Sequence, residues 1–147
     1  MILLSQRGLL AIAAVVDVAL HARPSPVAAK ALAARHDLPP RHLETLLQTL
    51  VRASILKGVR GPRGGYELAR ERRRISVGEI VRAALSDNDD RGKPRSRLVD
   101  AVIQPLVADA SLAFLTALDA LTVDDLCKRA EQQAVFGPML AKSDFTI

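Results

Sequence analysis

The chain of 147 residues is 49% apolar and 25% charged, a composition that excludes a disordered chain, a collagen-like repeat and a disulfide scaffold. Aromatic residues make up only 3%, which argues against a surface that stacks single-stranded bases on aromatic rings. The net charge of +5 is uneven, because residues 1–76 carry thirteen Lys and Arg against five Asp and Glu, whereas residues 77–147 carry eight against eleven. We expect only the first half, at +8, to meet a polyanion, although a soluble arginine-rich surface explains the charge equally well.

The N-terminal segment is strongly apolar and predicts a buried helix over residues 5–21. Its run Gly8–Val16 has the length of a signal-peptide core, but Asp17 interrupts it and no charge precedes it within residues 1–4. The run is also too short to span a bilayer. The single Cys127 cannot form an intramolecular disulfide, which favours a reducing compartment. We therefore expect a cytoplasmic protein without a membrane partner.

Two short helices joined by a tight turn follow a proline-bearing loop. An alanine-rich helix is predicted over residues 28–36, and Asp37 suits the left-handed turn after it. Pro40 fits the first turn of the next helix, which is expected over residues 40–53. One face of that helix is apolar at Leu43, Leu46, Leu47, Leu50 and Val51. The opposite face is polar at Arg41, His42, Thr45, Gln48, Thr49 and Arg52. This pattern predicts a helix-turn-helix, although two helices of any bundle give a similar signal.

A hairpin with a glycine- and arginine-rich tip comes next. The strands are expected at Ile55–Val59 and Tyr66–Ala69, and residues 60–65 between them hold three glycines and two arginines. A structural hairpin needs the glycines but has no use for paired arginines, whereas a probe of a DNA groove needs both. A nucleotide-binding loop is the competing idea, but no Gly-Lys-Ser/Thr ending follows it.

The second half of the chain is helical around one polar stretch. Ser76 to Glu79 forms a capping box, which predicts a helix through Leu85. Residues 86–97 are polar and are expected to form a linker; their faint likeness to a calcium loop is broken by Arg91 and Leu98.

A long helical pattern runs over residues 98–121, with Pro105 beginning a new helix or kinking this one. Its apolar stripe comprises Leu106, Val107, Ala110, Ala113, Phe114, Ala117, Leu118 and Leu121. A second copy of the chain would cover this stripe most simply, and packing back on the first domain is the alternative. Thr122 and Asp125 resemble another capping box, before a last helix over residues 123–134. The expected organisation is a DNA-binding domain over 1–85, a linker over 86–97 and a helical dimerisation region over 98–147.

Four segments carry a resemblance to one known family. They are Leu43–Leu50, Val59–Leu68, Ile75–Ile80 and Leu121–Leu126, of which the hairpin segment is the most specific. The chain resembles, over residues 3–130, the Rrf-two family of bacterial winged-helix transcription regulators (IscR/NsrR-like). The resemblance implies a mainly α fold: a winged helix-turn-helix with a small two-stranded wing and a C-terminal dimerisation helix. It also implies a homodimer on a pseudo-palindromic double-stranded DNA operator.

The resemblance places DNA contacts on the recognition helix and the wing. The residues expected to contact DNA are Pro40, Arg41, His42, Glu44, Thr45, Gln48, Arg52, Lys57, Arg60, Gly61, Arg63, Gly64 and Gly65. Arg60 is expected in the minor groove. The expected dimer interface comprises Leu106, Val107, Ala110, Phe114, Ala117, Leu118 and Leu121. Solvation alone also explains Arg41, Arg52 and Lys57, and a local ion pair explains Glu44.

The sequence departs from the family at its cofactor site. Cluster-binding members carry three cysteines in the loop before the long helix, but residues 86–97 contain none, and Leu98 and Ala101 stand where the late ligands would fall. We therefore expect no iron–sulfur cluster, no other metal and no other cofactor; the effector is unknown. We expect a DNA-binding transcriptional regulator that acts as a repressor. We do not expect an enzyme, because no catalytic constellation is present in the sequence. The alternatives are a winged-helix protein–protein adaptor and a redox-responsive regulator acting through Cys127.

Overall fold

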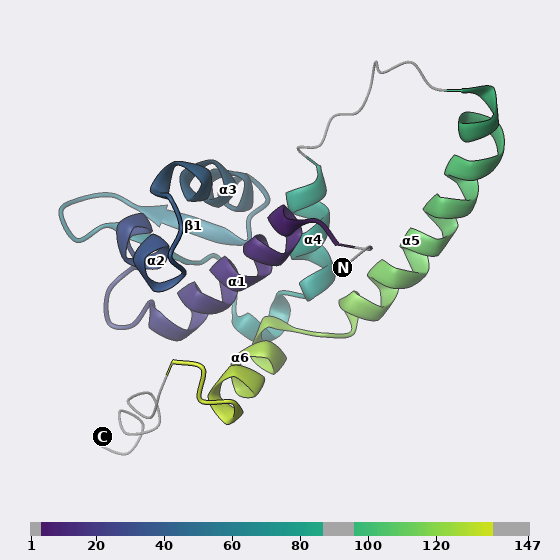
Figure 1. The fold of residues 1–147 in the computed structure, drawn as a ribbon. Coiled ribbons are helices and arrows are strands. Elements are labelled where there is room, and N and C mark those ends of the chain that lie inside the picture. Colours follow the sequence, from purple (N-terminus) through teal and green to yellow (C-terminus); the bar gives the residue numbers. More distant parts are fainter. Residues whose placement is uncertain (1–3, 87–95, 137–147) are drawn as a thin grey trace.

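The computed structural model describes residues 4–86 and 96–136 (Figure 1). Within them the fold is mainly helical with one two-stranded antiparallel sheet, which confirms the predicted class. The predicted linker over 86–97 lies outside the described residues except for Ser86, Ser96 and Arg97. The end of the predicted dimerisation region, from residue 137 on, also lies outside them.

The first helix, α1, forms the centre of the core. It spans Gln6–His21, and the hydroxyl of Ser5 caps it by accepting a hydrogen bond from the Gly8 N–H at 3.2 Å. Ala14, Val15 and Val18 are fully buried among the leucines of the other helices. The apolar run that resembles a signal-peptide core therefore lies inside the domain.

The helix-turn-helix is present as predicted. Helix α2 spans Ala29–Arg35, Asp37 adopts a left-handed φ of 52°, and helix α3 spans Pro40–Arg52 with proline at its start. The four leucines of the α3 stripe are at most 1% exposed and Val51 is half-buried. Burial of this stripe fixes the rotation of α3 about its axis, so its polar face is directed outward.

The wing is a hairpin, as predicted, but its first strand starts one residue later and its second strand lies one residue earlier than expected. Strand β1 spans Leu56–Val59 and strand β2 spans Gly65–Leu68, in a register that pairs Leu56 with Leu68. The sequence did not reveal that Val27, from the loop before α2, bridges Tyr66 through hydrogen bonds of 2.9 and 2.8 Å. This bridge ties the base of the wing to the helix-turn-helix.

Helix α4 spans Val77–Leu85 and helix α6 spans Val123–Gln132, and each begins with the capping box that the sequence predicts. The two helix starts also join each other, because the N-caps Ser76 and Thr122 form an antiparallel bridge. Preceding α4 is a single 3₁₀ turn, η1, at Arg72–Arg74. Because α6 adds Val123 and Cys127 to the main core, the end of the chain returns to the domain formed by α1 to α4.

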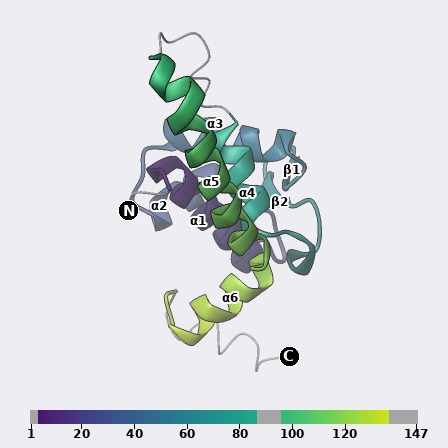
Figure 2. The same cartoon turned by 90° about the vertical axis from the view of Figure 1, so that its right-hand side faces the viewer.

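Helix α5 crosses in front of this domain in the view of Figure 2 and extends beyond it at the top. It spans Gln104–Asp119 and continues a π-helical segment, η2, at Val99–Ile103. Pro105 lies in the first turn of α5, directly after the π-helical segment, which agrees with the expectation that it begins a helix. A residue without an N–H donor is tolerated at this position. Figure 1 shows α5 at the right of the molecule, in contact with the domain only near its C-terminal end.

Candidate nucleic-acid interface

The outward face of α3 carries most of the polar side chains that the sequence singles out. The α3 residues expected to contact DNA are all exposed: Pro40, Arg41, His42, Glu44, Thr45, Gln48 and Arg52. Thr49 was expected on the same face, and this expectation is wrong, because Thr49 is 4% exposed. Its hydroxyl donates to the Thr45 carbonyl at 3.1 Å and accepts from Arg7 at 3.3 Å. Because its hydroxyl has hydrogen-bond partners inside the domain, Thr49 can occupy a core position that its polarity alone does not predict.

Three exposed arginines on α3 and the wing tip have no partner among the residues that the structure describes. In the part of the chain that the structure describes, Arg41, Arg60 and Arg63 make neither an ion pair nor a side-chain hydrogen bond. Arg52, at the end of α3, donates to the Thr49 hydroxyl at 3.4 Å. A guanidinium group presents five donors in a planar fork that suits phosphates and the acceptor edges of guanine. These side chains are therefore available for an anionic partner.

Glycine is required at the wing positions for two different physical reasons. Gly61 has a φ of 116°, a left-handed value that favours glycine, and space is open around it. At Gly64 a Cβ would collide with the Val59 carbonyl, and at Gly65 with the backbone of Val27. Gly64 and Gly65 are thus required by close packing within the molecule, and Gly61 is the position of the tip that is open to a ligand. Figure 1 shows this loop projecting from the body at the left.

Lys57 lies on the wing but is partly engaged. Its ammonium group is 2.9 Å from the Glu67 carboxylate, and the two residues face each other across the strands. Lys57 is 59% exposed, so this pair is a surface ion pair of small energy. The side chain can still move to a phosphate at little cost.

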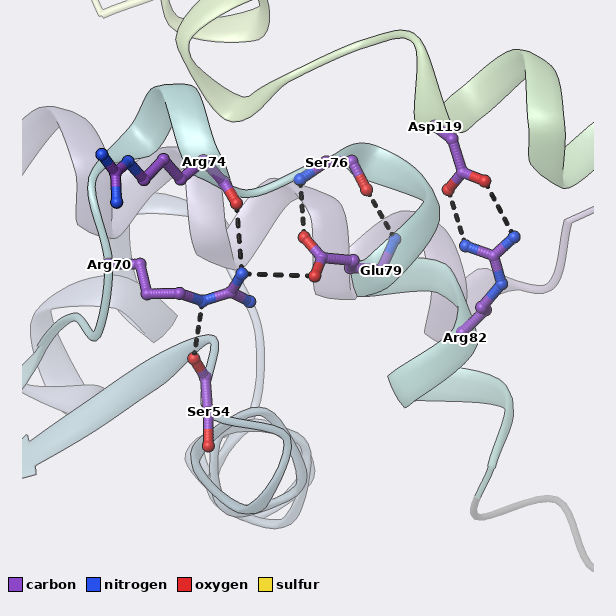
Figure 3. Close-up of polar contacts among 7 residues, drawn as sticks. All are labelled: Ser54, Arg70, Arg74, Ser76, Glu79, Arg82 and Asp119. Carbon is purple, nitrogen blue, oxygen red and sulfur yellow. Dashed lines mark hydrogen bonds and ion pairs between the residues drawn. The ribbon is translucent and has the colours of Figure 1, made fainter.

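A second set of arginines, after the wing, is bound to carboxylates, which no pattern in the sequence predicts. Arg70 contacts Glu79 at 3.2 Å and Arg72 contacts Asp124 at 3.0 Å. Figure 3 shows Arg70 lying between the carbonyls of Ser54 and Arg74 and the Glu79 side chain. These arginines tie elements together, so not all of the +8 charge of the first half faces solvent freely.

A buried carboxylate joins α1 to the helix-turn-helix. Asp17 is fully buried and accepts two hydrogen bonds from the Arg35 guanidinium, at 2.9 and 2.6 Å, and lies 2.8 Å from the His36 ring. The His21 ring lies 3.4 Å from the same carboxylate. Contact with Asp17 raises the pKa of Arg35 above its ordinary value. One feature of the sequence could have indicated this site: a charged residue at a core position of an apolar helix.

The predicted dimer stripe on α5 divides into two parts. Phe114, Leu118 and Leu121 are half-buried against a small cluster around Val77 and Val81, which is the alternative that the sequence left open. The rest of the stripe, Leu106, Val107, Ala110, Ala113 and Ala117, is exposed.

Further apolar residues upstream of the stripe are exposed as well. Leu98 is 62% exposed and Val102 is 49% exposed. The continuous helix Val99–Asp119 is long and apolar enough to cross a membrane by length and composition alone. A contiguous apolar surface of this length marks a site of association.

The thiol of Cys127 has an environment that suppresses its reactivity. The side chain is fully buried in α6. Burial raises the pKa of the Cys127 thiol above its ordinary value, although the neighbouring Arg72 guanidinium acts in the opposite direction. A reactive cysteine needs an exposed and electropositive setting, so this geometry does not favour a redox role.

Comparison with known proteins places these features in a family. The model of the family described as "Rrf2: Iron-dependent Transcriptional regulator" matches residues 4–129. The sequence is similar to the HTH-type transcriptional regulator IscR of Vibrio atlanticus (strain LGP32), with 32% identity over 133 residues, 87% of this chain and 76% of the relative. The fold is similar to that of T. potens IscR, at a TM-score of 0.69 and 33% identity, covering 88% of this chain and 89% of that one. It is also similar to CymR (YrzC), the global cysteine regulator of B. subtilis, at a TM-score of 0.68 and 27% identity, covering 88% and 98%.

The metal donors within the described residues do not fit the iron that the family description names. The whole sequence contains one cysteine, and iron–sulfur clusters are held by several thiolates. Within residues 4–86 and 96–136, no group of three or more His, Cys, Asp and Glu side chains is arranged to hold a metal ion. His21 and His36 are instead engaged with Asp17.

Proposed function

The chain belongs to the Rrf2 family of DNA-binding transcriptional regulators, and on that premise we propose that it acts as a homodimeric repressor. Two copies join through α5 and bind a pseudo-palindromic operator, each with one recognition helix in the major groove. Residues 1–85 form the DNA-binding domain, 86–97 the linker and 98–147 the dimerisation region. The protein acts in the cytoplasm, where its operator lies, and it has no catalytic step.

The observation that carries this proposal is the set of unpartnered guanidinium groups on α3 and the wing tip. Arg41 lies in the first turn of α3, where the side chains of a recognition helix reach base edges. His42, Glu44, Thr45 and Gln48 share its exposed face and supply the donors and acceptors that distinguish one base pair from another. Arg52 at the other end of the helix positions the protein by contacting phosphate.

The wing reads the neighbouring minor groove. Arg60 stands directly before Gly61, whose open surroundings let the backbone approach the DNA. An arginine is drawn to the negative potential of a narrow, A·T-rich minor groove. Arg63 and Lys57 add phosphate contacts on either side of the tip.

The exposed part of the α5 stripe supports the dimer. Leu106, Val107 and Ala110 lie within two turns of one helix and are open to solvent. In a two-fold dimer the same stripe of each copy covers the other, which removes this apolar surface from water. Phe114, Leu118 and Leu121 border that interface while they anchor α5 to its own domain.

The regulator works without an iron–sulfur cluster. The single cysteine supports this proposal, because a cluster needs more thiolates than the chain supplies. We expect the purified protein to be colourless and to take up no stoichiometric iron and sulfide on anaerobic reconstitution. A reproducible absorbance band at about 400 nm with bound iron and sulfide, of the kind that clusters give, contradicts this part of the proposal.

The proposal is tested by selecting duplexes from a random library with the purified full chain and weighing the complex by light scattering. We expect one enriched pseudo-palindromic motif, bound by two protomers. Failure to enrich any motif, or a monomer at micromolar concentration, contradicts it. An adaptor that binds protein instead of DNA would enrich no motif.

Two matched substitutions on α5 test the dimer. Leu106→Asp places a charge in the stripe and should shift the protein to monomers and weaken operator binding, since one half-site contact alone is weak. Leu112→Asp is the control, because Leu112 is also exposed, at 60%, but lies on a different face of the helix, outside the stripe. Equal effects of the two substitutions contradict the assignment of the stripe.

A further inference from the structure

Helix α4 contacts both the end of the recognition helix and the base of α5. At the first of these contacts, Arg70 donates from Nε to the Ser54 carbonyl at 3.3 Å and from Nη1 to the Glu79 carboxylate at 3.2 Å (Figure 3). Ser54 forms the left-handed turn that ends α3, with a φ of 60°, and Glu79 belongs to the capping box of α4. The recognition helix is therefore tied to the start of α4 by one guanidinium group.

At the second contact, Arg82 of α4 binds Asp119, the last residue of α5. The two nitrogens donate to the two carboxylate oxygens at 2.6 and 2.9 Å, a bidentate arrangement that Figure 3 shows side-on. Such a pair fixes orientation as well as distance, because both groups are planar. The Arg82 guanidinium also holds the pKa of Asp119 below its ordinary range, so the carboxylate is charged at neutral pH.

A glycine in α4 makes room for this carboxylate. The Asp119 Oδ1 atom occupies the place where a Cβ of Gly78 would stand, and Arg82 Nη1 lies 3.1 Å from the same point. Gly78 is buried in the first turn of a helix, a position where glycine is unfavourable compared with alanine. The seat that it provides for Asp119 accounts for its presence there.

The remaining contacts of α5 with the domain are apolar. Phe114, Leu115 and Leu118 pack on Val77 and Val81, a type of contact that holds the helix close without fixing its direction. Within the described part of the chain, the Arg82–Asp119 pair is the one ion pair between α5 and the rest of the protein.

We propose that Arg82 and Asp119 are positioning residues that set the direction of α5 relative to α4 and thereby the spacing of the two half-sites that the dimer reads. This inference rests on the proposed function. Because α5 has 16 residues, it is about 24 Å long, and a tilt of about 8° at its base moves its far end by about 3 Å. One base pair displaces a half-site by about 3.4 Å and rotates it by about a tenth of a turn. A small tilt, doubled by the two-fold axis, therefore changes which spacing fits.

The experiment compares the full-length protein with Arg82→Ala, Asp119→Ala and the double variant on duplexes whose selected half-sites are separated by spacers of varied length. The measured quantity is the ratio of affinities for the best spacer and for a spacer one base pair longer or shorter. We expect this ratio to fall by about threefold or more in each single variant and no further in the double variant. Affinity for an isolated half-site should change by less than about twofold, and the dimer should persist, because neither α3 nor the exposed stripe is altered.

Gly78→Ala and Arg73→Ala complete the test. In Gly78→Ala the added Cβ should displace the Asp119 carboxylate, so we expect the same loss of spacing preference as in Arg82→Ala. If the Arg82–Asp119 pair only stabilised the fold, Gly78→Ala would keep the spacing preference, because alanine favours a helix. Arg73→Ala removes an equal charge from an exposed side chain whose one ion pair within the described residues is with Glu71, at 3.6 Å, and it should keep the wild-type ratio. A wild-type ratio in both single variants, or loss of the dimer in them, overturns the inference while leaving the proposed function intact. A wild-type protein that binds duplexes without any spacing preference contradicts both.

Discussion

Two groups of arginines lie in the same domain and differ in what surrounds them. Arg35, Arg70 and Arg82 each bind a carboxylate of another element, at distances of 2.6 to 3.2 Å. Arg41, Arg60 and Arg63 are exposed and bind no carboxylate of the described chain. The first group joins helices to one another, and the second is free to bind phosphates and bases. A count of basic residues does not separate the two, although their functions differ.

The surroundings of each arginine explain the difference. Arg60 and Arg63 lie on a tip rich in glycine. The acidic residue nearest to them in the sequence, Glu67, is paired with Lys57. Arg70 and Arg72 follow the wing in a segment that packs on α4 and α6, both of which present carboxylates. The wing tip thus remains positive, whereas the base of the wing is neutralised.

The largest effect is expected at the buried carboxylate of the paired group. Asp17→Ala leaves the Arg35 guanidinium without its partner and should lower the free energy of unfolding by about 3–5 kcal/mol. Urea unfolding followed by circular dichroism measures this change. Glu71→Ala is the control, because it breaks an exposed pair worth less than about 1 kcal/mol. Equal stability of Asp17→Ala and wild type contradicts the structural role of this group.

A smaller effect is expected at the wing tip, on DNA binding rather than on folding. Arg60→Ala should weaken operator binding by about 1–3 kcal/mol per protomer and relax the preference for A·T pairs at the flanks of each half-site. The urea midpoint should stay unchanged, since the Arg60 side chain makes no ion pair or hydrogen bond within the described chain. Titration of operator and scrambled duplexes measures the effect, and an intact flank preference shows that the wing does not read DNA.

Local patterns in the sequence predicted much of this molecule. Both capping boxes are confirmed because their partners lie three residues apart, and the leucine stripe of α3 is confirmed because one helix face buries as a unit. The burial of Thr49, the bridge from Val27 to the wing and the Arg82–Asp119 pair depend on segments distant in the sequence. No local pattern specifies such contacts. The DNA contacts and the dimer interface stay predictions.

Phosphate contacts should produce a still smaller and less selective effect. Arg52→Ala and Lys57→Ala should weaken all duplexes about equally, and each should reduce the slope of log affinity against log salt by about one unit. Lys57→Ala is the more informative variant, because Lys57 is exposed like the unpartnered arginines but pairs with Glu67 like the arginines that bind carboxylates. An unchanged slope in Lys57→Ala assigns it to the structural group.

The smallest expected effect concerns acidity. Because Arg82 lowers the pKa of Asp119, the stabilisation from this pair is present above the ordinary pKa of aspartate and is lost only as pH falls through the lowered value. The half-site spacing preference should therefore be constant from about pH 5.5 to pH 8. Titration of the spacer duplexes at both ends of this range measures it, and a preference that weakens toward pH 5.5 contradicts the account.

Two triple variants that lose the same charge test the comparison most directly. Arg41→Ala/Arg60→Ala/Arg63→Ala removes the unpartnered guanidinium groups of α3 and the wing tip, and Arg73→Ala/Arg74→Ala/Arg129→Ala removes three exposed arginines of η1 and α6. Affinity for the selected operator is measured at several salt concentrations for both proteins. The account predicts that the first variant loses sequence preference and about three units of salt slope, while the second keeps its preference for the operator over scrambled DNA. Equal losses in the two variants would show that bulk charge, and not the recognition helix and wing, accounts for binding.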